Sequence, residues 1–168
     1  MADGLVLDSS AALAILLGEP ERTSVRERLA TVAGQPLLVL DLFWLEVVNV
    51  LVRRHRWDAD AVVEAVRELD ELVIETVALE RPLLLAALDL ATARGVTVYD
   101  AAHLALAEAA DVGLLTLDAG LARAAGERAA IRSQRGTREA DSPYSDDAPR
   151  PDWARHGRYL AELRRAAG

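Results

Sequence analysis

The sequence predicts an α/β fold in which a mostly parallel sheet is covered by helices on both faces. Short apolar runs of strand length alternate along the chain with longer segments of helical periodicity. This alternation is typical of β–α–β units, whose consecutive strands are parallel. Hydrophobic residues make up 52% of the 168 residues, which is enough for one sizeable core with both sheet faces buried.

The first elements are defined by apolar runs and by the glycines that follow them. Residues 5–7 are expected to form a buried strand that leads into a helix at 9–17, which Gly18 ends. A second helix at 20–33 follows. Its apolar side is provided by residues three or four positions apart, Val25, Leu29 and Val32.

The middle of the chain repeats this order. A strand is expected at residues 36–40, and Asp41 is placed to cap a helix that runs to about Arg56. Residues 58–72 have a buried stripe of helical period, and residues 74–79 alternate loosely like a strand.

The last elements follow the same signals. Pro82 near the start and Gly95 after the end predict a helix over 82–94. The run 96–98 leads into a helix that we expect to begin at Asp100.

A buried strand is predicted at 113–117, and a helix that begins at Asp118 ends near Gly126. Residues 129–132 are a candidate for a last edge strand.

The composition changes at Ser133. Residues 134–152 are rich in Arg, Asp, Ser and Pro, which is typical of a linker, and helical character returns from Trp153. We therefore divide the chain into a folded domain at 1–132 and, at 133–168, a linker with a short C-terminal helical tail.

Composition also excludes several kinds of chemistry. The chain has no Cys, which excludes disulfides, zinc–thiolate sites and thiol catalysis, and it has no Lys, which excludes a Schiff base and a P-loop lysine. The net charge of −8 argues against a broad basic surface for nucleic acid, but not against a nuclease whose bound metal supplies the positive charge. Without a signal-like N-terminus or a long apolar span, we expect a cytoplasmic protein with no membrane association.

Three acids stand where an apolar run gives way to an Ala-rich helix: Asp8, Asp100 and Asp118. If the strands are parallel, these acids gather at the carboxyl edge of the sheet, where open α/β sheets place their sites. Each acid is also placed to cap a helix, and capping alone is sufficient to explain any one of them.

Glu46 has no such explanation, because it lies inside a helix that is otherwise almost wholly apolar. Helical spacing places Glu46, Asn49 and Arg53 on one stripe. The core side of the same helix is expected to consist of Phe43, Val47, Val50 and Leu51. A carboxylate in these surroundings costs free energy unless it is paired or binds a metal, so Glu46 favours a metal site.

The segments around these acids resemble the PIN-domain ribonucleases, and specifically the VapC-type toxins of bacterial toxin–antitoxin pairs. The matching segments are LDSSA at 7–11, EVVNVL at 46–51, VYDAAHLALA at 98–107 and LTLD at 115–118. They occur in the family's order and with its spacing, over about residues 4–132. The resemblance implies a PIN-like three-layer α/β/α sandwich, with a central, mostly parallel sheet of four to five strands and a nuclease domain at 1–132.

The resemblance also implies an activity. The family consists of Mg²⁺- or Mn²⁺-dependent endoribonucleases that hydrolyse RNA phosphodiester bonds with metal-activated water, and the implied metal-binding and catalytic residues are Asp8, Glu46, Asp100 and Asp118. Their chemistry agrees, because hard divalent cations prefer carboxylate oxygens and a bound metal neutralises charge on the scissile phosphate. A homodimer and a neutralising VapB-type antitoxin are implied as partners.

Five further residues are candidates for supporting roles. Ser10, Asn49 and Thr116 are expected to orient carboxylates or waters. His103 lies three residues after Asp100 and should face the same way. We interpret His103 as a polar residue at the rim of the site in preference to a phosphate or leaving-group contact, because Mg²⁺ prefers oxygen ligands.

Arg53 belongs to a basic cluster with Arg54, His55 and Arg56. It is either a contact for RNA phosphates or an ordinary solvated helix end, since cations also favour helix C-termini.

Three alternatives to the ribonuclease hypothesis remain open. One is a catalytically inactive PIN fold that serves as a binding module, and another is a DNA-directed nuclease of the same fold. The third is an aspartyl-phosphate enzyme with Asp8 as nucleophile. Against the third, Ser10 occupies the place of the second Asp in a haloacid-dehalogenase-type motif, and Lys is absent. Only the resemblance favours RNA over DNA.

Overall fold

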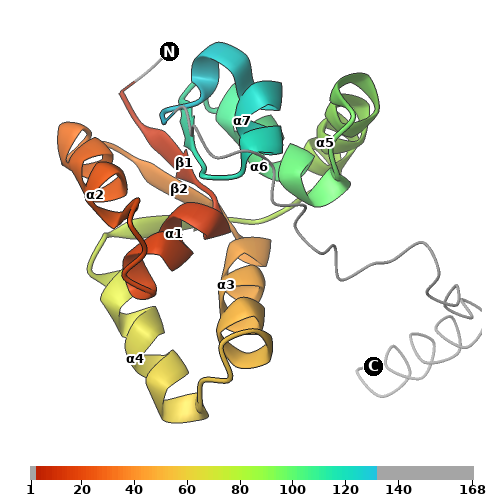
Figure 1. The fold of residues 1–168 in the computed structure, drawn as a ribbon. Helices are drawn as coiled ribbons and strands as arrows, with labels where there is room; N and C mark the ends of the chain where they lie inside the picture. Colours follow the sequence, from red (N-terminus) through yellow and green to blue (C-terminus); the bar gives the residue numbers. More distant parts are fainter. Residues whose placement is uncertain (1–2, 132–168) are drawn as a thin grey trace, which may run out of the picture. The chain divides into compact units, whose positions relative to one another are not determined.

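Residues 3–131, which are the residues that the computed structural model describes, form a three-layer α/β/α sandwich (Figure 1). The sheet of this part consists of β1 (Leu5–Leu7), β2 (Leu37–Leu40), β3 (Ile74–Val77) and β4 (Gly113–Leu115). The strand order is β3-β2-β1-β4, and all three neighbouring pairs are parallel. The predicted sandwich with a central parallel sheet is confirmed.

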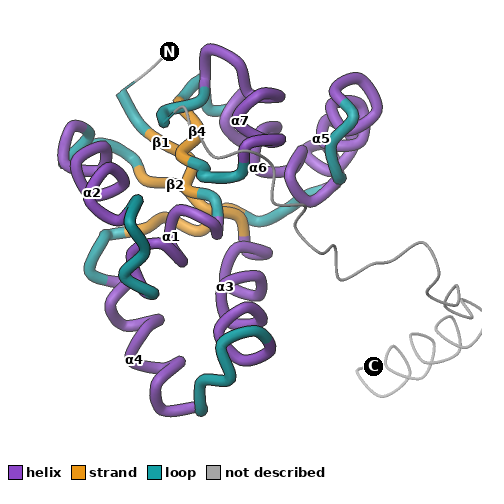
Figure 2. The backbone as a smooth tube through the Cα atoms, viewed as in Figure 1, coloured by secondary structure: helices purple, strands orange, loops and turns teal. Residues whose placement is uncertain are grey.

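Helices cover both faces of the sheet (Figures 1 and 2). One face packs against α1 (Ser9–Leu16), α2 (Arg22–Thr31), α3 (Asp41–Arg53) and α4 (Ala59–Asp70). The other packs against α5 (Arg81–Arg94), α6 (Val98–Ala109) and α7 (Ala119–Ala125), after which comes the 3₁₀ turn η1 (Gly126–Arg128). Among the described residues, no single helix is long and apolar enough to cross a membrane; α5 and α6 meet that test only jointly, as a pair bent by 113°.

The central strand β1 contributes to both hydrophobic cores. Leu5 and Leu7 pack with α1 to α4, whereas Val6 between them packs with α5 to α7, and all three side chains are fully buried. Successive side chains of a strand point to opposite faces, so a three-residue strand can serve two layers only if every residue is apolar.

The strand order creates a crevice at the carboxyl end of β1. The chain moves from β1 through β2 to β3 in one direction, and then returns across the other face to place β4 on the far side of β1. The connections that leave β1 and β4 therefore diverge onto opposite faces, which is the arrangement that opens a binding crevice in α/β sheets. Asp8 directly follows β1, and Asp118 lies three residues after β4.

The predicted helix caps are partly confirmed. Asp8 and Asp118 each accept a hydrogen bond from a backbone N–H in the first turn of their helix, and Asp58 does the same for α4 although no cap was predicted there. Two predicted caps are wrong. Asp41 is the first residue of α3 because β2 runs directly into that helix, with Leu40 as the extended residue before it.

The helix expected to begin at Asp100 begins two residues earlier. Thr97 is its N-cap, since the Thr97 hydroxyl accepts a hydrogen bond from the backbone N–H of Asp100. Asp100 therefore lies in the first turn of α6, and residues 96–98 lead into the helix without forming a strand.

The C-terminal edge of the sheet is shorter than predicted. β4 ends at Leu115, because the backbone N–H groups of Leu117 and Asp118 donate to the hydroxyls of Ser10 and Thr116 instead of to a neighbouring strand. In place of the expected edge strand at 129–132, Ala129 forms one isolated parallel bridge with Leu114. The predicted linker and tail at 133–168 lie outside the described residues.

Val73, between α4 and β3, has a backbone conformation that is unfavourable for its residue type. Its φ of 55° is in the left-handed region, and its side chain is 84% exposed. A β-branched residue is strained there, by about 1–3 kcal/mol. We predict that Val73→Gly raises the free energy of unfolding by about 1 kcal/mol in urea denaturation, because glycine has no Cβ to clash.

The matched control is Val63→Gly, at an exposed position inside α4. This change is expected to lower the free energy of unfolding, since glycine is a poor helix former. A decrease for both variants would contradict the assignment of strain to Val73.

Candidate metal centre

The carboxylate of Asp8 is fixed by three hydrogen bonds to one of its oxygens. Oδ2 accepts from the backbone N–H of Ser10 (3.2 Å), from the Ser10 hydroxyl and from the Thr116 hydroxyl (2.9 Å). The Asp8 residue is only 5% exposed. Because the donors all use Oδ2, the other oxygen, Oδ1, remains directed to the centre of the site, 3.9 Å from Nε2 of His103.

The same two hydroxyls join the ends of β1 and β4. The Ser10 hydroxyl accepts from the backbone N–H of Leu117 (2.9 Å), and the Thr116 hydroxyl accepts from that of Asp118 (3.0 Å). Each hydroxyl has one hydrogen and two lone pairs, so it can donate to Asp8 and accept from the backbone at once. Ser10 and Thr116 thus contact Asp8 as the sequence predicts, and they also shape the loop that carries Asp118.

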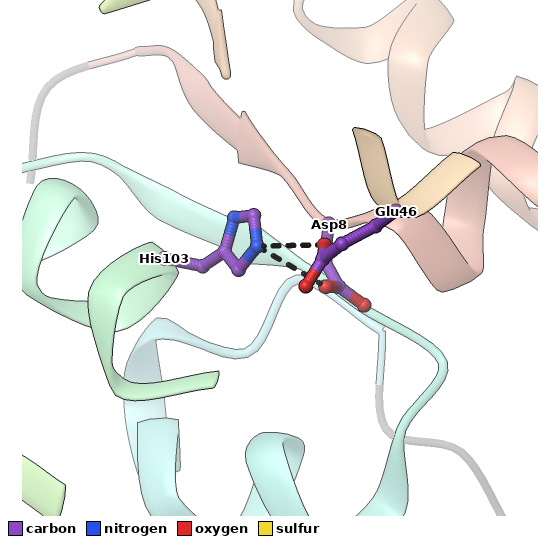
Figure 3. A group of neighbouring side chains, drawn as sticks. All are labelled: Asp8, Glu46 and His103. Carbon is purple, nitrogen blue, oxygen red and sulfur yellow. Dashed lines mark hydrogen bonds and ion pairs between the residues drawn. The ribbon is translucent and has the colours of Figure 1, made fainter. Parts of the chain in front are cut away.

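Glu46 reaches the site from the middle of a helix. Its helix α3 is anchored by the buried side chains of Phe43, Val47 and Leu51, and Val50 is half-buried. The Glu46 side chain is 27% exposed, and its Oε2 lies 3.2 Å from Nε2 of His103. Figure 3 shows Asp8, Glu46 and His103 pointing toward one another from the end of β1, from α3 and from α6.

The interpretation of His103 as a rim residue is wrong, because the side chain is only 1% exposed. Seven consecutive residues of α6, from Ala101 to Ala107, are buried. Other elements cover this part of α6 on every side. The side chain of His103 faces the same way as that of Asp100, and it is therefore buried deep in the site. The sequence carries a signal for this: AAHLALA is apolar on all faces, which is typical of a buried helix.

Asp100 and Asp118 are near these residues, but among the described residues the ligand atoms within 4.8 Å of one another are those of Asp8, Glu46 and His103. The Thr97 hydroxyl donates to Oδ2 of Asp100 (2.7 Å), and Asp118 Oδ1 accepts from the backbone N–H of Leu121 (2.7 Å). Burial raises the pKa of Asp100 above its usual value, and the charges of Asp8 and Asp118 raise it further, against the lowering effect of the Thr97 hydrogen bond. These three aspartates therefore lie close enough to repel one another.

The pKa of His103 is also affected by the negative charge of the neighbouring acids. Burial by itself lowers the pKa of this imidazole. The hydrogen bond with Glu46 and the charges of Asp8, Glu46 and Asp100 raise it, and the net direction is upward. The site therefore favours positive charge even at a position withdrawn from water.

Residues 5–127 match the family model of the PIN domain. The chain belongs to the PIN-domain family. It is 43% identical over 122 residues to Ribonuclease VapC3 of Pyrobaculum aerophilum, a match that covers 70% of this chain and 92% of that relative. The resemblance stated from the sequence is confirmed.

Two solved structures support the PIN fold. The crystal structure of PAE2754 from Pyrobaculum aerophilum has a TM-score of 0.53 and 26% identity, and the match covers 75% of this chain and 87% of that one. Mycobacterium tuberculosis VapC20, a sarcin-ricin loop cleaving toxin, has a TM-score of 0.57 and 17% identity, with coverage of 71% and 94%. The likeness to VapC20 shows the fold alone.

The residues of this PIN domain fit a divalent cation. Asp8, Glu46 and His103 each offer one ligand atom, and these atoms all lie within 4.8 Å of one another. Among the salt bridges between described residues, none joins an arginine to an acid of the site. Carboxylates gathered in this way without an arginine partner match the oxygen donors that hard divalent cations require.

Asp100 and Asp118 are not among these mutually close ligand atoms. Nor are two other candidates from the sequence. Asn49 and Arg53 lie on α3 beyond Glu46, and both are exposed. Their expected roles as an orienting residue and a substrate contact remain predictions.

Burial of the Asp100 carboxyl and its repulsion by Asp8 and Asp118 have a measurable cost in the metal-free protein. Because the pKa of Asp100 is raised above its usual value of 3.8, folding loses stability as the pH rises through that raised value. We predict that Asp100→Asn, which removes the charge, has a higher melting temperature than wild type in EDTA at about pH 7. The difference should shrink as the pH falls toward 3.8, where the native carboxyl is protonated.

Thermal melts at a series of pH values would measure this difference. The control is Asp89→Asn, which changes an exposed acid on α5 and should leave the melting temperature unchanged. A lower melting temperature for Asp100→Asn at neutral pH would contradict the proposed repulsion.

Proposed function

We propose that this PIN domain is a Mg²⁺- or Mn²⁺-dependent endoribonuclease that acts as the toxin of a toxin–antitoxin pair. The observation that carries the proposal is the convergence of Asp8 and Glu46 on one point, with Asp100 and Asp118 beside it. The name of the relative at 43% identity, Ribonuclease VapC3, supports the substrate class, and it agrees with the toxin role that the family resemblance implies.

Asp8, Glu46, Asp100 and Asp118 are the residues that would hold the cation. When bound, a divalent cation supplies an activated water for attack on phosphorus and neutralises charge that develops on the scissile phosphate. Oδ1 of Asp8 is available for this role because Oδ2 is occupied by its three donors. Ser10 and Thr116 keep that orientation fixed, which is how neighbours of a metal ligand tune a site.

The acids also account for a requirement for metal. Without a cation, the cluster repels the phosphates of RNA, since like charges in a partly buried site are weakly screened. When a bound cation neutralises that charge, the same crevice can bind a phosphate. RNA binding near Asp8 should therefore depend on the cation as strongly as cleavage does.

The partners and the location extend the proposal. The chain forms a homodimer, a VapB-type antitoxin neutralises it, and both act in the cytoplasm. The VapC name of the relative at 43% identity supports the antitoxin partner, whereas the homodimer and the cytoplasmic location are what the family resemblance implies.

Cleavage of RNA by the purified full chain tests the proposal. With Mg²⁺ or Mn²⁺ present we expect internal cleavage of RNA, and we expect none in EDTA or in the Asp8→Asn and Asp100→Asn variants. Asparagine keeps an oxygen for capping and hydrogen bonding, so these variants should still fold. Asp89→Asn is the control and should cleave normally.

Activity that persists in both site variants would contradict the proposal. Cleavage of single-stranded DNA but not RNA would support the DNA-directed alternative. An intact fold that binds Mg²⁺ without cleaving either polymer would support the binding-module alternative.

Arg53 is proposed to contact a phosphate of the bound RNA, because it is exposed at the end of the helix that carries Glu46. We predict that Arg53→Ala weakens RNA binding and reduces the slope of log K against log salt by about 0.7–1, the value for one lost phosphate contact. Fluorescence anisotropy with Asp8→Asn protein avoids cleavage during the titration. Arg81→Ala, at the start of α5, should leave the slope unchanged, and an unchanged slope for Arg53→Ala would remove Arg53 from the RNA surface.

A further inference from the structure

His103 has one ring nitrogen in the site and one outside it. Nε2 lies 3.2 Å from Oε2 of Glu46 and 3.9 Å from Oδ1 of Asp8. Nδ1 is buried and has no hydrogen-bond partner among the described residues. Among the described residues, the hydrogen-bond partner of the ring is therefore Glu46.

These contacts are compatible with two roles that need different protonation of the ring. As a metal ligand, His103 would offer the lone pair of Nε2, and the hydrogen of the neutral ring would be on Nδ1. As a donor, it would carry the hydrogen on Nε2 and give it to Glu46. The role of His103 therefore depends on which form of the ring the buried environment accepts.

The surroundings of Nδ1 discriminate between the roles. A metal-binding histidine almost always donates its second N–H to a carboxylate, a carbonyl or a water. Here that N–H would be buried without an acceptor among the described residues, which costs free energy. The neutral ring with its hydrogen on Nε2 and the protonated ring both donate to Glu46, and neither has a lone pair on Nε2 for a metal.

We infer that His103 is a positioning residue, whose Nε2–H donates to Glu46 and holds that carboxylate beside Asp8, and that it is not itself a metal ligand. Glu46 belongs to the layer of α1 to α4, and His103 belongs to the layer of α5 to α7. This hydrogen bond thus sets the spacing of the acids across the edge of the sheet. The inference rests on the proposed function in one respect, since it requires a cation between these carboxylates.

Binding of Mg²⁺ to the full chain, measured by calorimetry without RNA, tests the inference. His103→Leu keeps the volume but removes the donor, and we expect it to weaken Mg²⁺ binding by about 10- to 100-fold. His103→Gln places an amide N–H near the position of Nε2, so its affinity should stay within about threefold of wild type. His55→Leu makes the same substitution at an exposed position and should have no effect.

A second measurement separates a positioning residue from a ligand. Pulsed electron paramagnetic resonance of the Mn²⁺-loaded wild type should show no coupling to a directly bound imidazole nitrogen. A nitrogen coupling that is lost in His103→Gln would overturn the inference, and so would wild-type Mg²⁺ affinity in His103→Leu. If His103→Gln binds Mg²⁺ as weakly as His103→Leu, the loss of affinity is not caused by the loss of a hydrogen bond from Nε2, and the inference is also overturned.

These outcomes are distinct from a failure of the proposed function. A protein that shows the expected order of Mg²⁺ affinities but leaves RNA intact would overturn the ribonuclease proposal and support the role of His103. A wild-type chain that binds no Mg²⁺ would overturn both.

Discussion

The site depends on the three hydrogen bonds that converge on one oxygen of Asp8. Their donors come from both sides of the crevice, since Ser10 belongs to the first turn of α1 and Thr116 follows β4. The same hydroxyls accept backbone N–H groups of Leu117 and Asp118. One buried carboxylate therefore holds the ends of two neighbouring strands in register, and its own orientation is set by the loop that it helps to hold.

The sheet topology explains why the acids meet although they are far apart in the sequence. β1 lies between β2 and β4, and the helices that follow β1 and β4 cover opposite faces. Asp8 and Asp118 lie at this point of divergence, whereas Glu46 and Asp100 project from α3 and α6, one helix from each layer. This arrangement is costly without a cation, because burial and repulsion by Asp8 and Asp118 disfavour the charge of Asp100. Strain of this kind is expected where a site is built for a ligand.

The fold and the four acids could be predicted from the sequence because their signals are local. Apolar runs of strand length mark the sheet, and Glu46 is conspicuous in an apolar helix. The depth of His103 was missed although AAHLALA is apolar on all faces. The capping role of Thr97 was missed because Asp100, three residues later, is itself a good capping residue. The hydroxyl bridge could not be predicted in detail either, since it joins Ser10 to Leu117 across more than a hundred residues.

Two of the four acids also cap a helix, whereas the other two do not. Asp8 and Asp118 cap α1 and α7, whereas Glu46 lies inside its helix and Asp100 leaves the capping of α6 to Thr97. The side-chain oxygen needed by a cap is also present in Asn, Ser and Thr. In a lineage that lost the chemistry but kept the fold, positions 8 and 118 would therefore be confined to this small set. Positions 46 and 100 would not be confined in this way, so the pattern of replacement itself would record which acids served the metal without also capping a helix.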